Sequence, residues 1–193
     1  MMNARWSLLA VPLLAALGCS DPVPLPAQGA ITLSVRLPAS TATGTCPDSG
    51  TTYLAGAPTP PSTSTPGNSL VDGDKGSHIS CSVKGSGGGF AFSGSMAVST
   101  TQGMAYPITV TFSNGVVDAS GRGTADIGVY VPPLSATYTS TEPCTIQVLG
   151  SPLQVKGGSI WASFSCPSIR NPPSGLCAVG SNSVVVFENC DGS

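Results

Sequence analysis

The sequence predicts an all-β protein: an antiparallel β-sandwich or jelly-roll-like barrel of about nine short strands, stapled by disulfides. Short segments alternate apolar and polar residues with a period of two, as Ile31–Leu37 does. The 24 glycines and 18 prolines punctuate the chain between these segments. After Leu17, no stretch has the apolar spacing of an amphipathic helix.

In chain order, the alternating segments predict strands separated by turns. The main expected strands are 31–37, 79–83, 90–98, 108–112, 125–131, 144–148, 160–166 and 183–189, with shorter or weaker candidates at 52–54, 70–71, 116–117 and 137–139. Asp72-Gly73 and Asn114-Gly115 each predict a tight hairpin turn. Gly94 is expected to kink or bulge the strand that contains it.

The segment that ends at Cys19 indicates the compartment. Arg5 carries the charge of a short polar head, and Trp6–Leu17 is almost wholly apolar. This run is shorter than the roughly 20 apolar residues that span a bilayer, but it suits a signal-peptide core. Ala16-Leu17-Gly18-Cys19 resembles the lipobox of bacterial lipoproteins, in which cleavage leaves the cysteine first and acylated.

This resemblance implies a signal peptide at residues 1–18 and lipidation of Cys19. Two or more acyl chains hold a protein stably on a membrane, so the expected location is the bacterial cell envelope. Ser20, rather than aspartate, follows the cysteine and favours the outer membrane. The alternative is an ordinary secretory signal cleaved after Gly29.

Beyond the lipobox, the sequence divides into a tether and one domain. Residues 19–30 carry proline at 22, 24 and 26, which favours an extended, semi-rigid tether. Residues 31–193 form the expected β-sandwich domain, with an irregular Ser/Thr/Pro-rich insertion near 38–68.

The composition excludes some classes of partner. Only 8% of the residues are charged, with seven basic against nine acidic side chains. A chain without a basic patch cannot neutralise a row of phosphates, so we expect no nucleic-acid partner.

Six cysteines follow the lipidation site, and an even number in an oxidising compartment predicts three disulfides. They are Cys46, Cys81, Cys144, Cys166, Cys177 and Cys190. A zinc site would need closely spaced ligands, and none occurs. Proximity along the chain ranks Cys166–Cys177 first and Cys46–Cys81 second, which leaves Cys144–Cys190, although the spacing alone allows fifteen pairings.

Catalytic chemistry has little support in the sequence. His78 is the one histidine, it lies where a strand leaves a turn, and no Gly-x-Ser-x-Gly motif exists. Asp72 and Asp74 could offer oxygens to calcium, but a turn-forming Asp-Gly explains Asp72 by itself. Glu142, Glu188 and Asp191 are scattered along the chain, so a glycosidase carboxylate pair has no support in the sequence, though folding could create one. We therefore expect no enzyme, no metal and no cofactor.

Two aromatic residues are the candidates for binding. Strand parity places Trp161 beside Ser163 and Ser165, opposite the apolar residues of its strand, and it places Tyr130 on the polar side of its own strand. An exposed aromatic ring among hydroxyls could stack on a sugar or anchor a protein, although a loop could also cover it. If Trp161 is exposed, Trp161→Ala should leave the folding transition nearly unchanged.

The domain also resembles small, uncharacterised lipoproteins of myxobacterial type. The residues that carry this likeness are Asp72-Gly73 ahead of Cys81, Pro143-Cys144, 161–167 and 187–190. The resemblance implies no activity. The sequence thus favours a non-catalytic, lipid-anchored envelope protein that serves as a structural or recognition module. The alternatives are an adhesin that binds carbohydrate or a cell surface and, more remotely, an envelope hydrolase. Expected partners are the membrane, through the lipid, and a glycan or an envelope protein.

Overall fold

The computed structural model describes residues 23–39, 45–58, 69–99, 107–150, 153–171 and 175–192. The predicted signal peptide, the predicted lipidation site Cys19 and the first part of the predicted tether lie outside the described residues.

The described regular structure consists of strands and two short 3-10 turns. The strands are β1 (Gln28–Arg36), β2 (Thr52–Ala55), β3 (Leu70–Val71), β4 (His78–Ser86), β5 (Gly89–Val98), β6 (Ile108–Val117), β7 (Arg122–Tyr130), β8 (Tyr138–Ser140), β9 (Cys144–Val148), β10 (Val155–Lys156), β11 (Ser159–Asn171) and β12 (Gly175–Glu188). The 3-10 turns are η1 (Asp74–Gly76) and η3 (Pro132–Leu134). The all-β prediction is confirmed.

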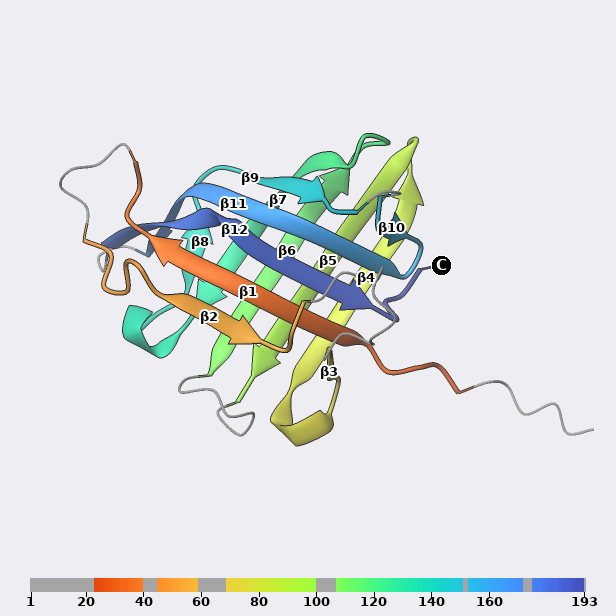
Figure 1. Cartoon of the computed structure of the whole chain (residues 1–193), viewed down its shortest axis with the longest axis horizontal. Coiled ribbons are helices and arrows are strands. Elements are labelled where there is room, and N and C mark those ends of the chain that lie inside the picture. Colours follow the sequence, from red (N-terminus) through yellow and green to blue (C-terminus); the bar gives the residue numbers. More distant parts are fainter. Residues whose placement is uncertain are drawn as a thin grey trace, which may run out of the picture.

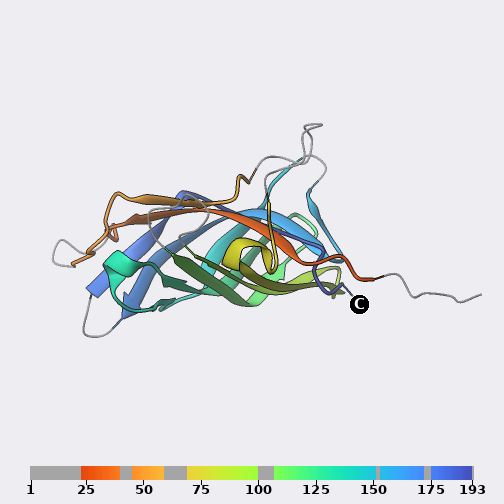
Figure 2. The ribbon, with the colours of Figure 1, turned by 90° about the horizontal axis from the view of Figure 1, so that it is seen from below.

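The strands form two layers, which we name layer A (β2-β1-β12-β11) and layer B (β7-β6-β5-β4). Strands β8 and β9 each pair with β7 and with β11, so the sheet continues around one side of the molecule from one layer to the other. The strands of the two layers cross obliquely (Figure 1), and the layers lie face to face (Figure 2). This is a sandwich built by folding one antiparallel sheet over itself.

The core fills the space between the layers. Because side chains alternate along a strand, Ile160, Ala162 and Phe164 of β11 point inward and are buried. The ring of Phe112 in layer B meets the rings of Phe164 and Phe187 in layer A edge-on, at centroid distances of 5.2 and 5.9 Å. These three aromatic rings join the layers.

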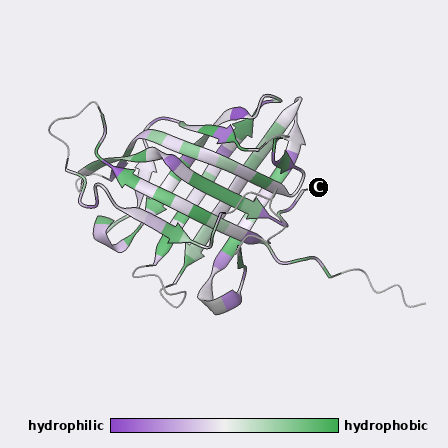
Figure 3. Cartoon of the chain, viewed as in Figure 1, coloured by the Kyte–Doolittle hydropathy of each residue, from purple (hydrophilic) through white to green (hydrophobic). Residues whose placement is uncertain are grey.

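The C-terminal half of β12 departs from simple alternation. Val184-Val185-Val186-Phe187 appears as a continuous apolar run in Figure 3. Val185 and Phe187 face the core, whereas Val186 points to the outer side of layer A and is still only 7% exposed. This part of the outer side of layer A is therefore buried as well.

The prediction of a hairpin turn at Asn114-Gly115 is wrong. β6 runs unbroken through both residues, and its register to β7 shifts between Ser113 and Val116. Asn114 adopts the left-handed conformation, with φ of 53°. Its side-chain Nδ2 donates a hydrogen bond of 2.8 Å to the carboxylate of Asp126. The same residue types suit a β-bulge and a tight turn, so the dipeptide does not distinguish them. The chain turns at Asp118 instead, where the amide of Gly121 donates to its carbonyl.

The predicted hairpin at Asp72-Gly73 is wrong too. β3 pairs with the start of β1 at Gln28 and Gly29, and no pairing with β4 is present in the described residues. Asp72 contributes in another way, because its carboxylate accepts a hydrogen bond from the amide of Ile79 at 2.8 Å. The predicted bulge at Gly94 is confirmed by a register shift in β5.

All six expected cysteines form disulfides, but the ranked pairing is wrong. The bonds are Cys46–Cys177, Cys81–Cys190 and Cys144–Cys166. Cys144 and Cys166 meet because β9 pairs with β11, and Cys81 and Cys190 meet because the C-terminal residues run along β4. Strand pairing, rather than distance along the chain, decides which thiols come together.

The described part of the expected insertion near 38–68 is anchored to the domain. It contains β2, which pairs with β1, and Cys46, which is bonded to the buried Cys177. At the tether, β1 already begins at Gln28, inside the predicted segment 19–30.

Candidate functional site

The outer side of layer B presents a group of hydroxyl side chains. Strand register places Ser80 of β4 opposite Ser95 of β5, and Ser95 opposite Thr111 of β6. In the next row, Ser82 lies opposite Ser93. The Oγ atoms of Ser80 and Ser95 lie 2.9 Å apart and share a hydrogen bond. We name these five residues the hydroxyl face.

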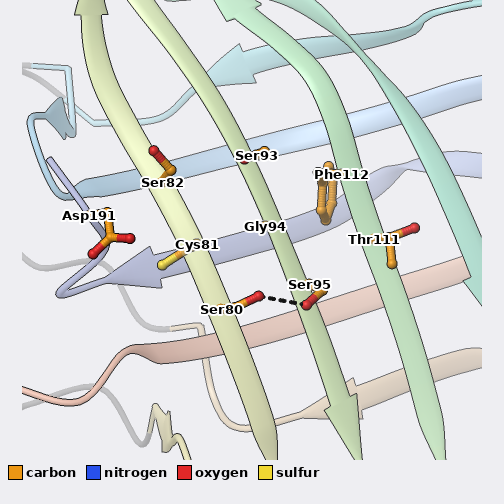
Figure 4. A pocket seen from close by; sticks show the side chains of 9 residues that line it. All are labelled: Ser80, Cys81, Ser82, Ser93, Gly94, Ser95, Thr111, Phe112 and Asp191. Atoms are coloured by element: carbon orange, nitrogen blue, oxygen red, sulfur yellow. Dashed lines mark hydrogen bonds between the residues drawn. The ribbon is translucent and has the colours of Figure 1, made fainter.

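The hydroxyl face lines a hollow of about 440 Å³, which we name the hydroxyl hollow. Cys81, Gly94 and Phe112 form its deeper part, and Asp191 completes the lining from the edge of β4 (Figure 4). A Cβ atom on Gly94 would lie 2.7 Å from ring carbons of Phe187. Glycine here therefore lets the core ring lie directly beneath the hollow.

Asp191 reaches the hollow because the C-terminal strap, Cys190–Gly192, runs along the edge of β4. The amide of Val83 donates to the carbonyl of Asp191 at 2.9 Å, and the amide of Asp191 donates to the carbonyl of Cys81 at 3.0 Å. The disulfide Cys81–Cys190 joins the same two segments covalently. The strap thus covers part of an otherwise open sheet edge.

The chemistry of this hollow is that of a polar, weakly charged surface. A serine or threonine hydroxyl can donate one hydrogen bond and accept others, so the lining can pair with hydroxyl groups on a ligand. Of the described residues in the lining, Asp191 alone carries a carboxylate, and His78 is not among them. His78 is exposed at the first position of β4, where the sequence placed it. Among the described residues, no three His, Cys, Asp or Glu side chains gather as metal ligands.

Tyr130 lies on the same outer side of layer B, at the end of β7. Its strand neighbours Ile127 and Val129 are buried, while Tyr130 is half-buried and pairs with Thr109 of β6. The predicted parity is therefore correct. Tyr130 does not line the hydroxyl hollow.

Trp161 lies on the outer side of the other layer, so the two aromatic candidates are not brought together. Trp161 and its strand neighbours Ser163 and Ser165 are half-buried between fully buried positions, which agrees with the predicted parity. The indole Nε1, however, is buried and has no hydrogen-bond partner among the described residues. The segment before β11 pairs with the main chain of Trp161, whose amide donates to Gln154 and whose carbonyl accepts from Leu149. Trp161 is therefore half-buried, with the N–H edge of its indole covered.

A second hollow, of about 310 Å³, lies at the tips of the β4–β5 and β6–β7 hairpins. Phe90, Asp118 and Arg122 are among the residues that line it. The carboxylate of Asp118 accepts hydrogen bonds from the Ser120 hydroxyl at 2.6 Å and from the Arg122 amide at 3.1 Å. These bonds lower the pKa of Asp118, with the Ser120 hydroxyl as the main cause. Because Asp118 already holds its own turn together, this hollow is the weaker candidate.

One further polar group is buried deep in the sandwich. Tyr138 has no exposed surface, and its hydroxyl has no partner among the described residues. Desolvation by burial raises the pKa of Tyr138, which keeps the phenol protonated. Tyr138 therefore belongs to the core and not to a site open to ligands.

No protein-family model, curated protein or solved structure matches this chain. Within the described ranges, no helix has the length and apolar character that crossing a membrane requires. The chemistry of the site therefore has to be inferred from its own residues. Strand alternation puts Ser80 and Ser82 on the side opposite the apolar Ile79 and Val83, but it does not show which serines of the next strand lie beside them.

Proposed function

We propose that this protein is a non-catalytic, lipid-anchored recognition module of the bacterial cell envelope, whose hydroxyl hollow binds a neutral glycan. The observation that carries the proposal is the cross-strand alignment of Ser80, Ser95 and Thr111, with Ser82 and Ser93 beside them, around a hollow on the outer side of layer B.

The lining favours a glycan over a charged or an apolar ligand. Five hydroxyl groups offer donors and acceptors in two rows, as a sugar chain does, and neutral hydrogen bonds between such groups need no charge on either partner. None of the described residues that line the hollow is a lysine or an arginine that could hold an acidic ligand.

The membrane attachment rests on the lipobox-like residues Ala16–Cys19 and the apolar run before them. The outer membrane is the proposed location, with the tether holding the sandwich away from the lipid. Cys19→Ser should abolish incorporation of a fatty-acid analogue and release the protein from acyl-dependent attachment. Undiminished labelling of this variant would refute lipidation at Cys19.

Binding can be tested with the neutral polysaccharide fraction extracted from the envelope of the source bacterium. The processed protein should be retarded in a gel that contains this polysaccharide. The variant Ser95→Ala/Thr111→Ala removes two hydroxyls from the hollow and should lose most of the retardation. The control Ser163→Ala/Ser165→Ala removes two hydroxyls from the outer side of layer A and should behave as the unmodified protein does.

The result separates the candidate functions. No retardation of the unmodified protein, or equal losses in the two double variants, would contradict glycan recognition by the hydroxyl hollow. A crosslinking pull-down from intact cells with the lipidated protein would then show whether an envelope protein is the partner instead.

A further inference from the structure

The carboxylate of Asp191 stands out within the hydroxyl hollow. It is the one ionisable side chain among the lining residues that the structure describes, and it lies at the edge of β4 in Figure 4. Among the described residues, no side-chain hydrogen bond or ion pair engages this carboxylate, although the main chain of Asp191 is held on both sides. Its position is therefore set by the backbone, and its oxygens remain available to a ligand.

The strap that carries Asp191 is fixed at several points. Besides the two hydrogen bonds between Asp191 and β4, the amide of Cys190 donates to Gly158 at 2.8 Å, and the amide of Gly158 donates to Val83 at 2.9 Å. The disulfide Cys81–Cys190 adds a covalent link between the strap and a strand that lines the hollow. Because the backbone of the strap is held this firmly, only the side-chain torsions of Asp191 have to be ordered when a ligand binds.

The hydrogen-bonding capacity of Asp191 differs from that of the serines around it. An ionised carboxylate only accepts, through two oxygens that can engage two neighbouring donors at once, and such charge-assisted bonds are stronger than neutral ones. On a neutral sugar, two neighbouring donors are a pair of adjacent free hydroxyls. An acidic sugar would instead be repelled.

We propose that Asp191 determines the specificity of the hydroxyl hollow by selecting neutral glycans with an unsubstituted vicinal diol, and that the disulfide Cys81–Cys190 positions it. The proposal rests on the glycan recognition proposed above and names the chemical group that is recognised.

The test compares two forms of the same envelope polysaccharide, one native and one oxidised with periodate and then reduced with borohydride. This treatment cleaves the ring between adjacent free hydroxyls and so removes the vicinal diols. The unmodified protein should bind the native form about tenfold more tightly than the treated form, since a charge-assisted hydrogen bond contributes about that factor or more. Asp191→Asn should abolish this preference. The control Glu188→Gln, a carboxylate on the outer side of layer A, should retain it.

Two further variants examine the role of the strap. Asp191→Glu leaves the disulfide intact and moves the carboxylate by one methylene, so it should reduce the preference for the native form. Cys81→Ala/Cys190→Ala should reduce it to the level of Asp191→Asn, and adding Asp191→Asn to that variant should cause no further loss. Circular dichroism verifies that each variant is folded. If the cysteine variant does not fold, Asp191→Glu still tests whether the position of the carboxylate matters.

The outcomes distinguish this inference from the function on which it rests. If the unmodified protein binds neither form, glycan recognition itself is wrong. If it binds both forms equally, or if Asp191→Asn and Glu188→Gln keep the same preference, glycan recognition stands and the role of Asp191 is refuted. If Asp191→Asn loses the preference while the folded cysteine variant keeps it, the positioning role of the disulfide is refuted.

Discussion

The outer sides of the two layers obey the same strand alternation but differ in what they expose. On layer B, outward residues such as Ser80, Ser93 and Thr111 are hydroxyls open to solvent. On layer A, outward residues at one end are apolar and covered. Ala30 of β1 is 0% exposed, and its partner Val186 of β12, which also pairs with Trp161 of β11, is 7% exposed. One side is a candidate ligand surface, and the other has a second buried region.

This difference shows that parity and exposure are separate properties. A period of two assigns a residue to one side of a sheet, and it does so correctly for Trp161 and Tyr130. Whether that side meets water depends on segments that come from elsewhere in the chain. The buried Nε1 of Trp161 is the clearest case, because the indole points outward and its N–H is nevertheless removed from solvent.

The largest expected effect comes from placing a charge on each outer side. Val186→Asp should lower the free energy of unfolding by about 3 kcal/mol or more, because it puts an unpaired carboxylate in a buried apolar site. The matched change Ser93→Asp, on the exposed outer side of layer B, should stay within about 0.5 kcal/mol. Denaturant titration of both variants measures the contrast. Equal losses would show that the two sides do not differ in burial.

A smaller effect is expected at Trp161. Since the residue is half-buried, Trp161→Ala should cost about 1–3 kcal/mol, between an exposed substitution and the 3–5 kcal/mol of a fully buried aromatic residue. Trp161→Phe keeps most of the ring and removes the unpaired N–H, whose burial costs about 1–3 kcal/mol, so its net effect should be near zero. An unchanged unfolding midpoint in Trp161→Ala would restore the open platform that the sequence suggested.

The sequence predicts the fold class and the set of bonded cysteines because both depend on local features. Alternation and turn residues are visible within short windows, and six cysteines in an oxidising compartment pair whatever the topology. The pairs themselves follow from contacts between distant segments, as between Cys81 in β4 and Cys190 after β12. Asn114-Gly115 fails for a related reason, since only the partner strand β7 makes it a bulge.

The candidate site could be predicted only in part. The outward orientation of Ser80 and Ser82 follows from strand alternation with the buried Ile79 and Val83, which flank them. The hollow also needs the register of β5 and β6 and the strap that brings Asp191 to β4, and neither is visible in any local pattern. The residues of this candidate site come from separate strands and are brought together by the topology of the sheet.

The smallest expected effect concerns the response of layer B to acid. Asp118, in the turn between β6 and β7, has a pKa lowered chiefly by the hydrogen bond from the Ser120 hydroxyl and next by that from the Arg122 amide. Because the folded-state pKa lies below the unfolded one, the ionised carboxylate stabilises the folded protein above the unfolded pKa. This contribution is lost as the pH falls through the folded-state pKa, below about pH 4.

The test of this prediction uses one variant that removes the charge and one that removes the main cause of the shift. Asp118→Asn should be less stable than the unmodified protein near neutral pH, and the two stability curves should converge below about pH 4. Ser120→Ala should bring the pKa of Asp118, measured by NMR titration, back toward its ordinary value. If the Ser120→Ala titration matches that of the unmodified protein, then the hydroxyl does not hold the carboxylate. Since Asp118 is exposed to solvent, added salt should weaken any part of its effect that comes from the charge of Arg122, but not the part that comes from the Ser120 hydrogen bond.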